Sequence, residues 1–163
     1  TLEELGEQPV IIWANFHEEI EQIAHLLGNH AVTLYAKTKD RNESLRRFGN
    51  DARYLIAHPR SAGHGLTLTQ ASTCVWYSLD WSWEAYTQAN DRIHRIGQSR
   101  ACLYVHLIAK GRIDDHIWDI LQKKATLHEA LDQILGVRIA YQSTNRGGVE
   151  TTLAESVGVL SDG

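Results

Sequence analysis

Apolar residues are concentrated in five short runs, separated by stretches that mix polar and apolar residues. The runs are rich in β-branched and aromatic residues and show little alternation. Such continuous apolar character predicts strands buried on both faces, which is typical of parallel strands covered by helices. The predicted strands are residues 10–13, 31–35, 54–57, 74–79 and 102–109.

The stretches between the runs have apolar residues at helical spacing. The first predicted helix follows the first strand, with Asn15 as its N-cap. A second runs over residues 41–48, where Asp40 is placed to cap it. A third is expected over residues 82–96, and a fourth begins near Ile113.

Strands that alternate with helices predict an α/β fold. The expected architecture is an open, mainly parallel sheet with helices on both faces, formed by one domain of residues 1–140. The periodicity then fails, so we expect residues 141–163 to be a tail that is poorly structured or has one short helix. Thr152 and Glu155 are the candidate cap of that helix.

Composition excludes several classes of protein. No apolar run approaches the roughly 20 residues that a membrane helix needs. The two cysteines each lie inside an apolar segment, which predicts reduced core residues and an intracellular protein. A net charge of -4 argues against coating of nucleic acid through bulk charge, so any contact with DNA must be local. The nine histidines have no metal-ligand spacing, and no metal site is expected.

The loop after the third predicted strand is a candidate ligand site, because ligands of open α/β sheets bind at the carboxyl ends of strands. Gly63 and Gly65 in this loop allow a tight turn and close approach of the backbone, whose amides could hold a phosphate. The alternative is an ordinary strand-to-helix turn that contains glycine.

The third predicted helix carries a second candidate site. On a helical wheel, Gln88, Arg92 and Arg95 lie on one face, opposite the apolar residues that include Ile93 and Ile96. Two arginines three residues apart, with a glutamine one turn earlier, form a set of planar donors suited to phosphate oxygens. The alternative is a solvated helix face with chance arginines.

Taken in chain order, several segments resemble the motifs of Swi/Snf-type ATPases of helicase superfamily 2. The resemblance covers roughly residues 9–135, and its longest piece is residues 88–98, which resemble motif VI. Residues 79–84 depart from the Trp-Asn-Pro sequence that is usual in this family, so no DNA contact is assigned to them. The other matching segments are residues 10–16 (motif IV), 38–41 (motif IVa), 61–68 (motif V) and 111–117 (the helix after motif VI).

The resemblance implies a RecA-like lobe of the P-loop NTPase type, the second motor lobe of an ATP-dependent DNA helicase or translocase. It implies that Arg92 and Arg95 are arginine fingers for ATP, with Gln88 orienting them as the third catalytic residue. Gly63, Gly65 and Asp91 would contribute to nucleotide binding.

The resemblance also implies contacts with the DNA backbone through Thr38, Arg41, Ser61 and Thr67. These contacts would be independent of sequence, and the DNA is expected to be double-stranded.

ATP and Mg²⁺ would be held mainly by an N-terminal RecA-like lobe of the same parent chain, because these 163 residues contain no GxxxxGK[ST] loop. We therefore expect the chain to be a piece of a larger protein and to hydrolyse no ATP alone. A bacterial or phage parent would be cytoplasmic.

Two other functions stay open. One is a lobe of an RNA helicase, whose motif VI would normally continue with another arginine where this sequence has Gln98. The other is a non-catalytic α/β binding module, in which the arginines serve a partner interface.

Overall fold

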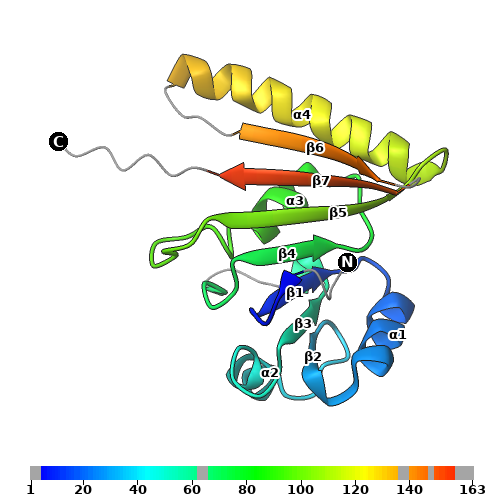
Figure 1. The fold of residues 1–163 in the computed structure, drawn as a ribbon, viewed down its shortest axis with the longest axis vertical. Helices are drawn as coiled ribbons and strands as arrows, with labels where there is room; N and C mark the ends of the chain where they lie inside the picture. Colours follow the sequence, from blue (N-terminus) through cyan, green and yellow to red (C-terminus); the bar gives the residue numbers. More distant parts are fainter. Residues whose placement is uncertain (1–4, 62–65, 136–139, 147–148, 157–163) are drawn as a thin grey trace.

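The computed structural model describes residues 5–61, 66–135, 140–146 and 149–156. These residues form a seven-stranded sheet in the order β2-β3-β1-β4-β5-β7-β6 (Figure 1). The first five strands of the chain are mutually parallel, whereas β7 is antiparallel to both β5 and β6. The strands are β1 (Val10–Trp13), β2 (Ala31–Leu34), β3 (Tyr54–Ala57), β4 (Thr73–Trp76), β5 (Cys102–Ala109), β6 (Ala140–Arg146) and β7 (Val149–Ser156).

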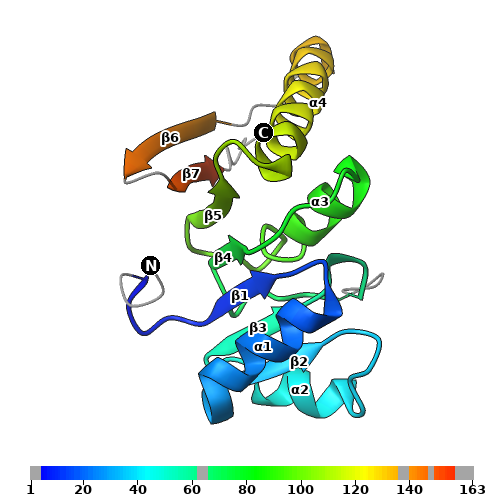
Figure 2. The same ribbon diagram turned by 90° about the vertical axis from the view of Figure 1, so that its right-hand side faces the viewer.

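Four α-helices cover the sheet, and none of the helices in the described part of the chain is long and apolar enough to cross a membrane. Figure 2 shows α3 and α4 on the same side of β4 and β5. The buried residues of α1 pack on the opposite face from those of α3 and α4. The helices are α1 (His17–Leu27), α2 (Arg41–Arg47), α3 (Trp83–Asn90) and α4 (Ile113–Leu135).

The larger core lies between the sheet and helices α2, α3 and α4, and aromatic rings fill its centre. Trp76 of β4 lies 5.9 Å from Trp13 and 4.9 Å from Tyr86, measured between ring centroids. The Tyr86 hydroxyl and the His106 Nε2 atom form a buried hydrogen bond of 3.0 Å. Trp76 Nε1 donates to Asn90 Oδ1 at 3.1 Å, which fixes the last residue of α3 against the sheet.

The predicted fold class is confirmed, since the sheet is open, mainly parallel and covered on both faces. The predicted strands and helices recur in the predicted order, with shifts at some ends. The first helix has Phe16 rather than Asn15 as its N-cap, and Glu19 accepts from the Phe16 amide. The Asn15 backbone amide donates instead to the Ser78 hydroxyl at 2.9 Å, so a tertiary hydrogen bond replaces the predicted cap.

Residues 140–156 differ from the tail that the sequence predicts. Where a poorly structured segment or one short helix is expected, β6 and β7 form an antiparallel pair, and the proposed cap residues Thr152 and Glu155 lie within β7. Pairing with β7 satisfies the backbone groups of β5, which would otherwise be the edge of the parallel sheet. The boundary at residue 140 between a lobe and a separate tail stays a prediction.

The loop after β3 contains a histidine in a partly desolvated position. His58 Nδ1 accepts a hydrogen bond of 3.2 Å from the Arg60 amide, which requires Nδ1 to be unprotonated. Desolvation by burial lowers the pKa of His58, and the charges of His17 and Arg60 lower it further. The folded chain therefore binds a proton at His58 less readily than the unfolded chain does.

We expect Asp40→Ala to lower the free energy of unfolding by about 1 kcal/mol, because Asp40 Oδ1 accepts from the Glu43 amide at 2.9 Å and caps α2. Equilibrium unfolding in urea measures the change. Asp40→Asn is the control, since it keeps the acceptor oxygen. The cap assignment is wrong if the Asn and Ala variants lose equal stability.

We expect His58 to make the fold more sensitive to acid. The pKa of His58 is lower in the folded chain than in the unfolded chain. Its contribution to stability is therefore complete above the unfolded pKa, and it is lost as the pH falls through the folded pKa. His58→Asn keeps an acceptor near the position of Nδ1 but cannot titrate. Urea unfolding at about pH 7.5 and about pH 5.5 should show a smaller acid loss for the variant. An equal or larger loss would contradict the assigned direction.

Candidate functional site

The two candidate arginines do not lie on a helix. Helix α3 ends at Asn90, although the sequence predicts that it continues to Ile96. Arg92 and Arg95 lie in the segment that follows, residues 91–98, which we call the arginine loop. Ile96 was expected on the core side of the helix, but its side chain is fully exposed. The predicted helical face of Gln88, Arg92 and Arg95 is therefore wrong.

The arginine loop is hydrogen-bonded to the segment that precedes β4. Leu68 N donates to Arg92 O at 2.9 Å. Arg95 Nη1 donates to Leu66 O and Thr67 Oγ1, both at 3.3 Å. Because this segment belongs to the predicted motif V, the structure brings together two motifs that are about 25 residues apart in the sequence.

Gln98 makes the largest set of side-chain hydrogen bonds between the arginine loop and its surroundings. Its Nε2 atom donates to Ala71 O at 2.7 Å and to Thr69 O and Ile93 O at 3.3 Å. Its Oε1 atom accepts from Arg100 N at 3.1 Å. In the sequence, Gln98 is part of the predicted motif VI and separates two helicase classes. Its hydrogen bonds could not be predicted there, because the partners are backbone atoms that no side-chain pattern reveals.

A tight turn closes the arginine loop. Gln98 N donates to Arg95 O at 2.9 Å, and Gly97 between them has a φ of 102°. This positive φ favours glycine, because a Cβ atom would strain the backbone there. The turn leaves Ile96 at its exposed tip.

The arginines differ in their surroundings. The Arg92 side chain is partly buried, and its Nε atom has no hydrogen-bond partner among the described residues. Arg95 is exposed. Partial desolvation raises the pKa of the neighbouring Asp91 carboxyl group, while the charges of Arg92 and His94 act in the opposite direction.

The Gln88 side chain is hydrogen-bonded within α3, whereas the resemblance implies that it orients the two arginines. Its Nε2 atom donates to Glu84 Oε1 at 3.0 Å, one turn earlier on α3. Within the described part of the chain, no hydrogen bond joins Gln88 to Arg92 or Arg95. Its proposed action on the arginines stays a prediction.

Two of the four predicted DNA contacts come together after β2 and β3. An Arg41 side-chain nitrogen donates to Ser61 O. Thr38 is used locally, because its hydroxyl accepts from Tyr35 N at 2.9 Å and lies 3.2 Å from Thr33 O, to which it donates. The fourth residue, Thr67, lies apart from these and contacts Arg95. The predicted phosphate-binding glycines, Gly63 and Gly65, lie outside the described residues.

The candidate residues therefore occupy opposite edges of the parallel sheet. The arginine loop lies at the amino edge, because it leads into β5 and bonds to the segment that leads into β4. Arg41 and Ser61 lie at the carboxyl edge, since they follow β2 and β3. In Figure 1 the loop before β5 is at the left and the start of α4 is at the right. The arginine loop is thus not at the carboxyl ends of the strands, where ligands of open α/β sheets usually bind.

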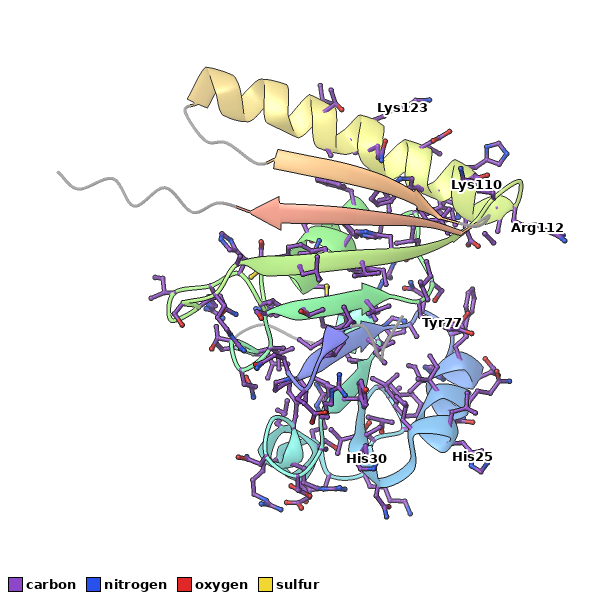
Figure 3. All side chains as sticks on the ribbon, in the orientation of Figure 1. His25, His30, Tyr77, Lys110, Arg112 and Lys123 are labelled. Carbon is purple, nitrogen blue, oxygen red and sulfur yellow. The ribbon has the colours of Figure 1, made fainter. Side chains whose placement is uncertain are left out.

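The carboxyl edge also has a large cavity, of about 1180 Å³, and none of the predicted site residues that the structure describes lines it. Ser78 joins its walls, because it donates to Glu19 Oε2 at 2.6 Å and accepts from Asn15 N. Tyr77 lines this cavity, and Figure 3 shows Lys110 and Arg112 at the same edge of the sheet. Among the residues whose placement is described, no cluster of His, Cys, Asp and Glu could hold a metal ion.

Comparison with known proteins connects these features to a family. Residues 1–97 match the model of the helicase conserved C-terminal domain. The chain is 30% identical over 128 residues to a SWI/SNF-related matrix-associated actin-dependent regulator of chromatin, subfamily A-like protein 1, from Xenopus tropicalis. It is 31% identical over 150 residues to Helicase SWR1 from Gibberella zeae.

These matches cover 74% and 88% of the chain, but only 14% and 9% of the respective relatives. Among solved structures, the C-terminal part of the Fun30 ATPase domain has a similar fold, with a TM-score of 0.63 at 23% identity. The similarity covers 74% of this chain and 40% of that one. It confirms the RecA-like fold that the resemblance implies. The chain thus belongs to the family of helicase conserved C-terminal domains, and its matched relatives include SWI/SNF-related and SWR1 proteins.

Proposed function

We propose that this domain is the second motor lobe of an ATP-dependent DNA helicase or translocase. In this proposal Arg92 and Arg95 contact the phosphates of ATP that a first lobe holds together with Mg²⁺. The domain supplies no loop for binding the phosphates by itself, so it is inactive without the first lobe. The relatives named helicases support the reaction class. An intracellular location follows from action on DNA.

The observation that carries the proposal is the unpaired charge of the arginine loop. Arg46, Arg47 and Arg60 each form an ion pair with a carboxylate. Neither Arg92 nor Arg95 has an ion pair among the residues that the structure describes. Two guanidinium groups held in one fixed loop without an ion pair to a carboxylate of the described residues are suited to an anion that arrives from outside the domain.

The chemistry required of these arginines is electrostatic. When a phosphoryl group is transferred, negative charge develops on its oxygens, and planar guanidinium donors stabilise that charge. Among the described residues, the hydrogen-bond acceptors of the Arg95 side chain are the neutral Leu66 O and Thr67 Oγ1, which leave its charge available.

DNA binding is proposed for the carboxyl edge, where Arg41 is exposed and bonds to Ser61 O. The net charge of -4 means that contacts with phosphate must be few and local. Thr38 extends this proposal to a further hydroxyl group at this edge, whereas the DNA contact proposed for Thr67 lies beside Arg95, before β4. Gly63, Gly65 and Asp91 extend the proposed nucleotide site. We propose duplex DNA as the substrate because of the resemblance to Swi/Snf-type motors.

In the parent protein with both lobes, we expect Arg95→Ala or Arg92→Ala to lower the kcat of DNA-stimulated ATP hydrolysis by at least about 10²-fold, or about 3 kcal/mol in the barrier. Each change removes a charge-stabilising donor from the transition state. Arg95→Lys should not restore the rate, because an ammonium group lacks the planar fork. Steady-state turnover at saturating DNA measures these effects.

Arg112→Ala is the matched control, since Arg112 is exposed at the other edge of the sheet (Figure 3). It should keep the parental rate. Thermal melting separates a lost contact from a lost fold. The proposal fails if the Arg92 and Arg95 variants are folded and hydrolyse ATP at the parental rate.

We expect Arg41→Ala to weaken binding to duplex DNA of any sequence and to reduce the slope of log K against log salt by about 1, the value for one phosphate contact. Arg46→Ala is the control on the same helix, because Arg46 is paired with Glu43. Fluorescence anisotropy over a range of salt concentrations measures both slopes. Equal slopes for Arg41→Ala and the parent protein would place the DNA elsewhere.

A further inference from the structure

We infer that Gln98 is a positioning residue for ATP hydrolysis, which fixes the arginine loop through its side-chain amide. The inference rests on the proposed function, because it concerns the loop that carries Arg92 and Arg95. Neither the roles that the resemblance implies nor the similar proteins assign a function to Gln98.

The Gln98 amide is fully used inside the domain. Its nitrogen faces three carbonyl oxygens, of Thr69, Ala71 and Ile93, and its oxygen accepts from Arg100 N. A glutamine amide has two N–H donors, and the three carbonyl oxygens within hydrogen-bond distance can occupy both. Gln98 therefore does not contact a phosphate itself and can affect the reaction only through the loop.

The partners of Gln98 belong to three separate parts of the chain. Thr69 and Ala71 precede β4, Ile93 lies in the arginine loop, and Arg100 leads into β5. One side chain thus joins the loop to the starts of two neighbouring strands. Those strands are part of the buried sheet, so the amide fixes the position of the loop relative to the core.

Two hydrogen bonds of Gln98 reach Arg95 itself and the residue two positions before it. The side chain holds Ile93 O, two residues before Arg95, and the Gln98 backbone amide donates to Arg95 O. Turn hydrogen bonds such as that from His94 N to Asn90 O, at 3.1 Å, also hold the start of the loop, but no helix or strand runs through it. An error of about 1 Å in the position of a catalytic group can cost about 10²-fold in rate, so a device that fixes this loop has a direct effect on kcat.

Few residue types can replace this amide. Glutamate keeps the shape and the acceptor for Arg100 N, but it sets a carboxylate against three carbonyl oxygens. Leucine has a similar size but neither donor nor acceptor. Arginine, the residue expected here in the RNA helicase alternative, has donors but no acceptor for Arg100 N. The fit to glutamine therefore favours a role inside the loop over contact with a ligand.

The test uses the full parent protein and compares Gln98→Glu and Gln98→Leu with Gln70→Glu. Gln70 is the matched control, because it is exposed and the bond it receives from Arg100 uses its backbone oxygen. We expect both Gln98 variants to lose at least about 10-fold in kcat, while the KM for ATP stays within about twofold. The Gln70 variant should keep both values.

A combined variant separates positioning from general stability. If Gln98 acts through the two arginines of the loop, then adding Gln98→Leu to a protein with both Arg92→Ala and Arg95→Ala should slow it by no more than about twofold. Rates are measured well below the lowest melting temperature of the set, so that every variant is folded. If Gln98→Glu fails to fold, the uncharged leucine variant carries the test.

The outcomes separate this inference from the proposed function. Parental kcat for a folded Gln98→Leu protein overturns the inference, as do losses that multiply when Gln98→Leu is added to the variant without both arginines. Parental kcat for Arg95→Ala overturns the proposed function instead. A large loss for Arg95→Ala with no loss for Gln98→Leu leaves the function standing and removes the role of Gln98.

Discussion

The arginine loop depends on hydrogen bonds to the segment before β4, because it has no regular secondary structure of its own. Leu68 N donates a hydrogen bond to Arg92 O. The Gln98 side-chain nitrogen donates to Ile93 O and to two carbonyl oxygens of that segment. In a longer α3, the carbonyls of residues 92 and 93 would accept from the next helical turn. Tertiary donors occupy them here, so the helix ends and the two arginines leave from a fixed loop.

This arrangement divides the proposed functions between the two edges of the sheet. The arginine loop lies at the amino edge, whereas Arg41 and Ser61 lie at the carboxyl edge. A four-residue strand such as β4 separates the edges by roughly 13 Å. Substitutions at one edge should therefore have separable effects on the two ligands.

The sequence predicted the buried parts of the fold well, because long apolar runs such as residues 54–57 have few alternatives to a covered parallel strand. It failed where tertiary hydrogen bonds decide the structure. The apolar spacing of Ile93 and Ile96 predicted a longer α3, yet Ile96 is exposed at a turn. The helical wheel singled out the pair of arginines and the resemblance implied their role, but neither predicted the position of their loop. Gln98 was missed because its partners are backbone oxygens from distant residues.

The central claim is that Arg92 and Arg95 stabilise the transition state of ATP hydrolysis in the assembled two-lobe protein. The most direct measurement is the affinity of that protein, parental and Arg95→Ala, for ADP with aluminium fluoride, which mimics the transferring phosphoryl group, and for ADP alone. We predict that the variant binds the aluminium fluoride complex about 10²-fold more weakly, with ADP affinity unchanged within about twofold. Equal affinity of the two proteins for the aluminium fluoride complex would contradict the account.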